Sequence, residues 1–193
     1  MTLTEQKIIN GIKYFVANTK NVGRTKLFKL LYFWDFIHFK RYGLSVTGYD
    51  YYTFLFGPVP KDLYEKIINE TLPQDFKDEL EFNLFDDRDE EYSEEYKSFK
   101  ILLHNKRIDL DVFSPNELTV LKEVAEIFKY ASAKEMTDIS HLPQDPWDIT
   151  KAQKGLNQPI DYFLSLDNES PFDRETIEER FKLQKELLSD GRI

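Results

Sequence analysis

The sequence has no cysteine and only seven glycines among its 193 residues. Without cysteine, disulfide bonds, thiolate catalysis and cysteine-ligated zinc or iron-sulfur sites are excluded. The glycines form no phosphate-binding loop, and the sequence contains no nucleophile elbow, no His-Glu-x-x-His zinc motif and no calcium-binding loop. These absences remove most enzyme classes. The sequence therefore predicts no catalytic residue, no metal and no cofactor, and we expect a protein that is not an enzyme.

Long apolar runs are also absent. Asp35 and His38 interrupt the most apolar segment, so no stretch of about 18 uncharged residues occurs, and the N-terminus has no apolar core of the kind found in signal peptides. With 41% hydrophobic and 32% charged residues, the composition is typical of a folded domain with a charged surface. We therefore expect a cytoplasmic protein with no membrane partner, built as a single domain over 1–193 with its core in about 5–155.

The most apolar segment, residues 26–42, predicts a central helix. On a helix of 3.6 residues per turn its apolar side chains fall on nearly every side, which is typical of a helix enclosed by other elements. Gly43 is placed to end this helix in a left-handed conformation. A preceding helix over about 5–17, capped by Thr4, completes an N-terminal helix pair.

The sequence pattern changes after the central helix. Aromatic residues alternate over 49–56, which predicts a strand with both faces covered, and Gly57-Pro58 then turns the chain into a short helix over 61–69. A hairpin over 97–111 is expected to pair with the strand over 49–56. The expected fold is α+β and predominantly helical, with a central buried helix and a small antiparallel sheet.

Later segments carry clear helix starts. Ser114 and Ser132 are each followed three residues later by glutamate, which predicts a capping box at the start of two helices. An amphipathic C-terminal helix is expected over 171–188. The stretch 86–95 holds seven acidic residues and one arginine, so we interpret it as a solvated loop insertion, with a nucleic-acid mimic or a docking tail as the alternatives.

Charge is unevenly distributed along the chain. Residues 1–42 carry a net charge of +6, although the whole chain has −9. A basic helix pair joined by a short turn loosely matches a helix-turn-helix, so a DNA-binding transcriptional regulator is the main alternative function. The second helix, however, has almost no polar face to present to DNA, and the negative net charge opposes binding to phosphates. We therefore do not expect nucleic acid as a partner.

The three histidines offer little chemistry. His38 lies among aromatics on the central helix, and His104 has no partner by spacing. His141 has Asp138 three residues before it, which supplies two metal ligands at most, whereas a metal site usually needs three or more. A hydrolase or nuclease centred on His141 and its aspartates remains a third hypothesis. We expect His141 to hydrogen-bond a helix end, with Trp147 packed beneath it.

Three motifs in order along the chain carry a resemblance to a known family. The first is Lys-Leu-x-Lys-Leu-Leu-Tyr, the second is Gly-Pro-Val followed by a helix with tyrosine, and the third is a histidine followed by Pro-Trp. The matching residues are Lys26, Leu27, Lys29, Leu30, Leu31 and Tyr32; Gly57, Pro58, Val59 and Tyr64; and His141, Pro146 and Trp147. Together they resemble the Panacea domain, also called the SocA-like antitoxin domain. Phe56 stands where family members commonly have tyrosine, and the acidic stretch 86–95 resembles an insertion relative to the family pattern.

The resemblance implies a mostly helical domain with a small sheet. It also implies an antitoxin of a bacterial toxin–antitoxin system, or a related phage or mobile-element protein, that neutralises a toxin protein by direct binding. The implied partners are a cognate toxin of unspecified identity and, for some members, a protease; no oligomeric state is implied.

The aromatic content of the chain independently favours protein binding. Aromatic side chains dominate the energetics of protein interfaces, and they make up 15% of this sequence. Tyr32, Tyr52, Tyr64 and Trp147 each combine an apolar ring with a polar tip that needs water or a partner. We predict these four as partner-binding residues, with a place in the core as the open alternative.

Overall fold

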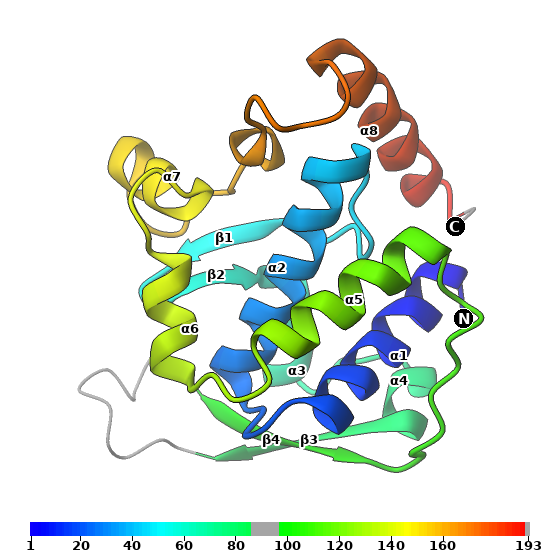
Figure 1. Cartoon of the computed structure of the whole chain (residues 1–193). Coiled ribbons are helices and arrows are strands. Elements are labelled where there is room, and N and C mark those ends of the chain that lie inside the picture. Colours follow the sequence, from blue (N-terminus) through cyan, green and yellow to red (C-terminus); the bar gives the residue numbers. More distant parts are fainter. Residues whose placement is uncertain (86–96, 192–193) are drawn as a thin grey trace.

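The structure, a computed structural model, describes residues 1–85 and 97–191, so the acidic stretch expected over 86–95 lies outside the described residues. Within these ranges the chain is predominantly helical with two small antiparallel sheets, which confirms the predicted α+β class (Figure 1). The helices are α1 (Leu3–Asn18), α2 (Arg24–Tyr42), α3 (Lys61–Ile68), α4 (Gln74–Glu79), α5 (Pro115–Ile127), α6 (Ala133–Ser140), α7 (Pro146–Lys154), the 3-10 helix η1 (Tyr162–Ser165) and α8 (Arg174–Ser189). The strands are β1 (Tyr51–Phe54), β2 (Gly57–Pro60), β3 (Leu80–Phe85) and β4 (Ser98–Leu103).

Helix α2 lies at the centre of the fold, as expected. It contacts α1, α5, α6, β2, β4 and η1, and Figure 1 shows it passing between α5 and the β1–β2 hairpin. Leu27, Phe28 and Phe36 lie on different sides of this helix by their spacing, and all three are buried. Gly43, at φ 72°, ends it in the left-handed conformation, and its N–H donates to the Phe39 carbonyl. The prediction of a central buried helix is therefore confirmed.

Helix α1 begins earlier than expected. Thr2, and not Thr4, is the cap, because its hydroxyl accepts from the Glu5 N–H while the Glu5 carboxylate accepts from the Thr2 N–H. The glutamate three residues after Thr2 completes a capping box that Thr4 lacks. Gly11 lets α1 approach α2 closely, since a Cβ there would lie 2.5 Å from the ring of Trp34.

One buried carboxylate connects α2 to the segment that follows it. Asp35 is fully buried, and its oxygens accept hydrogen bonds from the N–H groups of Val46 (2.7 Å) and Thr47 (2.8 Å) and from the hydroxyls of Thr47 (2.5 Å) and Tyr51 (2.7 Å). Burial raises the pKa of Asp35, and these hydrogen bonds oppose the rise. The residue that interrupts the apolar helix in sequence therefore fixes the loop leading into β1.

The first sheet corrects the expectation for residues 49–60. The strand expected over 49–56 is present but shorter, as β1, and the turn expected at Gly57-Pro58 is wrong, because these residues begin β2, which pairs with β1 in a hairpin with Tyr51 opposite Pro60. The chain turns at 55–56 instead. The two prolines of β2 lack an N–H and are tolerated because β2 pairs with β1 alone, whereas the other side of β1 pairs with residues near 159.

The second sheet corrects the expectation for residues 97–111. That segment does not form a hairpin: β4 pairs with β3 in a separate antiparallel sheet, and no strand occurs over 104–112. Phe99 in β4 packs edge-on against Phe82 in β3 and against Phe28 in α2, with ring centroids 5.2 and 5.7 Å apart. Alternation correctly indicated the strand, and contacts distant in sequence selected its partner.

The remaining helices follow their local signals. Ser114 caps α5 and Ser132 caps α6, and both predicted capping boxes are present. Helix α8 is capped by Asp173, slightly later than the expected start at 171, and it buries Ile177. In the part of the chain that the structure describes, no helix is long and apolar enough to cross a membrane.

Candidate functional site

The residues of the three motifs meet beneath the surface. Lys29 on α2 is fully buried, and its Nζ donates to the Pro58 carbonyl oxygen over 3.3 Å. Gly57 has φ 102°, and a Cβ there would lie 2.6 Å from Lys29 Cε and 2.7 Å from Ser140 Oγ. Burial, and then the positive charge of Arg24, lower the pKa of Lys29 to about 7. We call the contact of α2, β2 and the end of α6 the buried junction.

Lys26, the other lysine of the first motif, connects two loops. Its Nζ donates to the carbonyl oxygens of Lys20 (2.8 Å), Ala131 (2.7 Å) and Lys129 (3.4 Å), and burial lowers its pKa. These bonds hold the α1–α2 turn against the segment between α5 and α6. The leucines of the motif are fully buried in the core, namely Leu27, Leu30 and Leu31. The second motif continues the pattern, since Val59 is also buried.

The histidine and tryptophan of the third motif stack on each other. His141 follows α6, and its ring lies 3.6 Å from the ring of Trp147, with an angle of 10° between the planes. The Trp147 indole N–H donates to the Phe54 carbonyl over 3.2 Å. Burial, and then the charges of Lys29 and Lys151, lower the pKa of His141 to about 4, so its imidazole is neutral near pH 7. The expected packing of Trp147 against His141 is confirmed, whereas the hydrogen bond expected from the His141 side chain to a helix end is not found among the described residues.

This arrangement does not support chemistry at His141. Its Nε2 is buried and has no hydrogen-bond partner within the described ranges. Among the residues that the structure describes, no group of three or more histidine, aspartate or glutamate side chains is placed to hold a metal ion. His141 therefore fits the buried junction better than a hydrolytic centre.

The basic N-terminal helix pair is not presented as a DNA-binding surface. Four of its eight basic side chains are buried in the fold, and three others form ion pairs with acidic residues. The buried side chains are Lys13, Arg24, Lys26 and Lys29, and the other ion pairs are Lys7–Glu117, Lys40–Asp167 and Arg41–Glu123. A recognition helix must expose its side chains to a groove of the duplex, whereas α2 is enclosed. This placement counts against the DNA-binding alternative.

The four aromatics predicted to bind a partner lie in different environments. Trp147 is 2% exposed and Tyr32 3% exposed, so both rings belong to the interior. Tyr52 is half-buried, with Lys61 Nζ 5.1 Å from its ring centroid. Tyr64 is also half-buried and packs edge-on against Phe28. The structure does not gather them into one surface, and partner binding by these residues stays a prediction.

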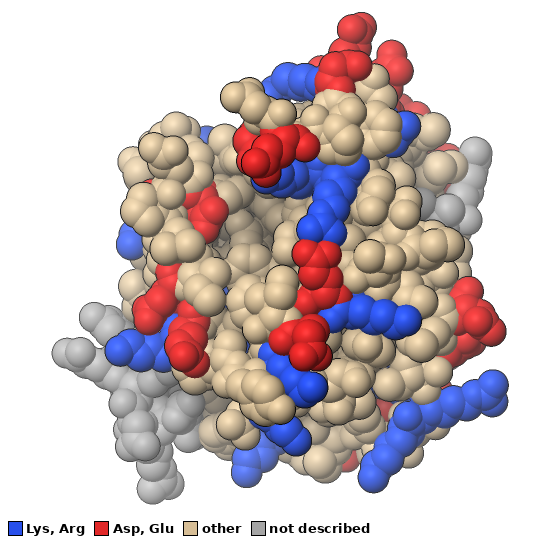
Figure 2. All heavy atoms as spheres, in the orientation of Figure 1, with Lys and Arg blue, Asp and Glu red and all other residues tan. Residues whose placement is uncertain are grey.

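An open apolar groove lies on the face where α2 is least covered. It has a volume of about 740 Å³ and lies between α2, the end of α5, α6, the start of α7 and the η1 segment. Figure 2 shows a hollow on this face, lined by uncharged atoms and bordered on one side by a row of charged side chains. The lining residues are Tyr32, Phe33, Phe36, Ile37, Lys40, Ile127, Phe128, Ile139, Gln144, Asp145, Pro146, Ile149, Leu164, Ser165, Leu166 and Asp167.

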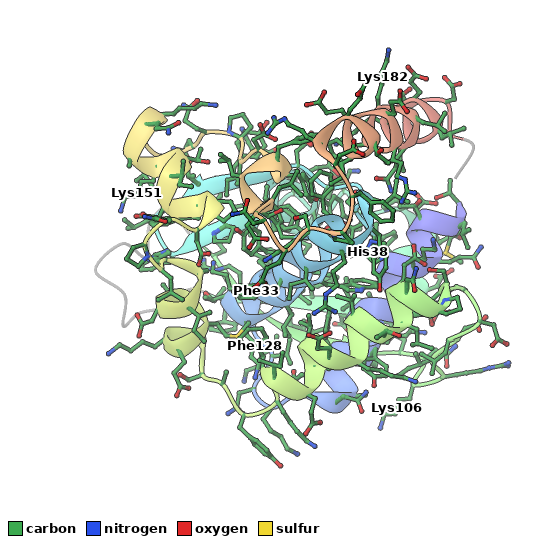
Figure 3. The ribbon with its side chains drawn as sticks, turned by 45° about the horizontal axis from the view of Figure 1, so that its top comes forward. Phe33, His38, Lys106, Phe128, Lys151 and Lys182 are labelled. Carbon is green, nitrogen blue, oxygen red and sulfur yellow. The ribbon has the colours of Figure 1, made fainter. Side chains whose placement is uncertain are left out.

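The lining of this groove leaves apolar side chains in contact with water. Phe33 on α2 stacks on Phe128 at the end of α5, with ring centroids 4.8 Å apart and 23° between the planes (Figure 3). Ile127 at the edge of the groove is 60% exposed, and Ile37 and Leu166 are half-buried. Apolar side chains that remain partly exposed along a groove make this face a candidate binding surface.

The charged groups of the groove are not balanced. Lys40 pairs with Asp167 at 2.5 Å. Asp145 stands at the N-cap of α7, yet its carboxylate makes no capping bond and has no other hydrogen-bond or ion-pair partner in the described part of the chain. Burial, and then the charge of Asp148, raise its pKa. An apolar groove with one unpaired, partly buried carboxylate is therefore the candidate functional site.

Of the residues singled out from the sequence, Tyr32 and Pro146 line this groove, and only Tyr32 had been predicted to bind a partner. The groove is assembled from five separate segments, and within each segment the lining residues have the spacing of an ordinary core face. The one signal for the groove in the sequence was Asp145 directly before Pro146, a pair that predicts the start of a helix. In the structure the Asp145 carboxylate does not cap that helix. That failure to cap becomes visible only in three dimensions.

These features define a predominantly helical domain with an open apolar groove on one face. The chain belongs to the antitoxin SocA-like family, because the Panacea domain model matches residues 27–148, which is more than half of its length. No curated protein and no solved structure matches the chain. The matched region includes the groove residues on α2, α5 and α6 and those before Ile149 at the start of α7, whereas Ile149 and the η1 wall lie beyond it.

Proposed function

We propose that this protein is the antitoxin of a toxin–antitoxin pair and neutralises a toxin protein by direct binding through the apolar groove. The observation that carries the proposal is an exposed apolar groove in a chain that belongs to the SocA-like antitoxin family. On this proposal the protein acts in the cytoplasm and acts by binding, without catalysis.

The groove has the physical properties that a protein partner requires. Its apolar side chains, among them Ile127, Phe33 and Leu166, gain free energy when a partner removes them from water, at about 25 cal/mol for each Å² buried. The stacked pair of Phe33 and Phe128 provides a rigid aromatic centre, which is the kind of residue that dominates interface energetics. Charged residues lie at the groove edge, as in the polar rim of typical interfaces.

The proposal predicts a toxic product encoded beside this chain. Each flanking reading frame is expressed alone and with this protein, and growth and co-purification are measured. We expect one frame to arrest growth, and this protein to restore growth and to co-purify with that product. A steady toxin level during rescue indicates masking, whereas a falling level indicates delivery to a protease. If no flanking frame is toxic and rescued, the proposed function is wrong.

Matched variants test whether the groove is the binding surface. Ile127→Asp places a charge in the groove, and Leu183→Asp makes the same change on α8 at a similar exposure, 60% against 57%. We expect Ile127→Asp to lose rescue and co-purification, because it buries an unpaired charge in the interface. Leu183→Asp should behave as the wild type. Equal rescue by both variants would move the binding surface away from the groove.

A further inference from the structure

The walls of the groove restrict the shape of what can bind there. They are formed by helices α2, α5, α6 and α7 and by η1, whose backbone N–H and C=O groups are largely paired within each helix. The two sheets of the described chain contribute no residue to the groove lining, so an extended peptide would find no strand edge to pair with. A helix satisfies its own backbone hydrogen bonds and presents a face of side chains, so it is the element that fits.

The charges of the groove restrict the chemistry of that helix. Among the lining residues, Lys40 and Asp167 neutralise each other, and Asp145 is left without a partner in the described chain. A helix that covers Asp145 removes water from its carboxylate, which is unfavourable unless a positive group replaces that water. An acidic helix face would meet repulsion from the same carboxylate. The groove therefore favours a basic side chain.

Tyr32 provides a second polar group in the groove lining. Its ring is buried among aromatics, and no described residue forms a hydrogen bond with its hydroxyl. Burial, and then the charge of Asp145, raise the pKa of Tyr32, and both residues line the same groove. A lysine or arginine side chain can donate hydrogen bonds to both the carboxylate and the hydroxyl oxygen.

We propose that the groove takes one amphipathic helix of the toxin, with apolar side chains against Phe33, Phe128 and Ile127 and with a lysine or arginine against Asp145 and the Tyr32 hydroxyl. This inference rests on the proposed function and adds the shape and charge of the element that is bound. The helix carries its apolar residues at i, i+3, i+4 and i+7, and its basic residue lies on the same face.

The test uses this protein with the toxic product that it rescues. Affinity is measured for wild type, Asp145→Asn, Asp145→Lys and Tyr32→Phe, with Asp138→Lys as the control, because Asp138 is exposed on α6 and does not line the groove. We expect Asp145→Lys to weaken binding by about 100-fold or more, as for the loss of a buried charge pair, and Asp145→Asn and Tyr32→Phe by smaller factors. Asp138→Lys should bind within about twofold of wild type, in the range of an exposed charge.

A charge exchange identifies the basic residue. Hydrogen exchange of the complex locates the protected toxin segment, and each lysine or arginine in it is changed to glutamate. We expect one such toxin variant to lose binding to wild type and to regain it with Asp145→Lys. Thermal melts should show all Asp145 variants folded, since this carboxylate makes no hydrogen bond in the described chain.

Other outcomes separate this inference from the proposed function. If Asp145→Lys binds the toxin as wild type does while Ile127→Asp fails, the groove is the site but a basic helix is not its occupant. A protected toxin segment that is extended, or that lacks a basic residue, overturns the inference in the same way. Wild-type dimers that Ile127→Asp converts to monomers would make a second copy the occupant. Absence of any rescued toxin removes the proposed function and the inference together.

Discussion

Replacement of Lys29 by methionine tests the buried junction directly. Methionine keeps most of the side-chain length but removes the amine, so the core stays filled while the hydrogen bond to the Pro58 carbonyl is lost. Burial, followed by the charge of Arg24, lowers the pKa of Lys29 from 10.5 to about 7 in the folded protein. The unfolded chain keeps the ordinary lysine pKa and therefore binds more protons than the folded chain between these two values.

The sign and size of the effect follow from this difference. Lys29 loses its proton at a lower pH in the folded protein than in the unfolded chain, so the folded state becomes more stable as pH rises. The stability of the wild type therefore increases relative to that of the variant between pH 7 and 10.5. The quantity to compare is the free energy of unfolding of wild type minus that of Lys29→Met. With these two pKa values, linkage predicts that this difference increases by about 2.5 kcal/mol from about pH 6 to about pH 9. Below that window the lysine is protonated in both states, and the difference is constant.

Urea unfolding of both proteins at several pH values across this window measures the difference. Tryptophan fluorescence is a suitable signal because both Trp34 and Trp147 are buried. Titrations common to the two proteins cancel. The pKa of His141, about 4 in wild type, depends in part on the Lys29 charge, so its rise in Lys29→Met affects only the acid end of the window. Equal slopes of free energy against urea would show that the two proteins expose the same surface. A difference that does not change with pH would mean that Lys29 stays charged when folded, which refutes the buried junction.

Three further substitutions test other parts of the structure by thermal or urea unfolding. Gly57→Ala should destabilise the protein by about 3 kcal/mol, because it combines a positive φ with a Cβ in contact with Lys29; a neutral result would mean that the junction has room. Asp35→Ala should lose about 3–5 kcal/mol by leaving several buried donors without an acceptor, and Asp35→Asn less, because its amide oxygen can still accept; equal losses would contradict this account. Ser114→Ala should lose about 1 kcal/mol with the cap of α5, and no loss would show that the cap is not needed.

Local features of this fold were predictable from sequence. The central helix followed from apolar residues on every side of one segment, and its end followed from Gly43. The caps of α5 and α6 followed from serine and glutamate at fixed spacing. Each of these signals acts within about one or two helical turns. Their correct placement therefore required no knowledge of distant contacts.

Features that depend on distant contacts were not predictable in the same way. The pairing of β3 with β4 is set by Phe82, Phe99 and Phe28, which are far apart in sequence. The two prolines of β2 argued against a strand, and only its edge position permits one. Likewise the lysines of the first motif contributed to a predicted basic helix pair, whereas the fold turns Lys26 and Lys29 inward to backbone carbonyls. The groove was missed for the same reason, since no single segment contains it.

The wall of the groove formed by residues 164–167 has a consequence for partner choice. It is anchored by Tyr162, whose ring stacks on Phe36 at 4.3 Å and whose hydroxyl donates to the Tyr49 carbonyl over 2.8 Å. The side chains of 164–167 themselves face the groove and lie beyond the family match that ends at 148. Substitutions in this wall therefore leave the anchor and the buried junction intact. On the proposed function, substitutions at 164–167 would therefore change which partner the groove accepts without altering the contacts that hold the fold together.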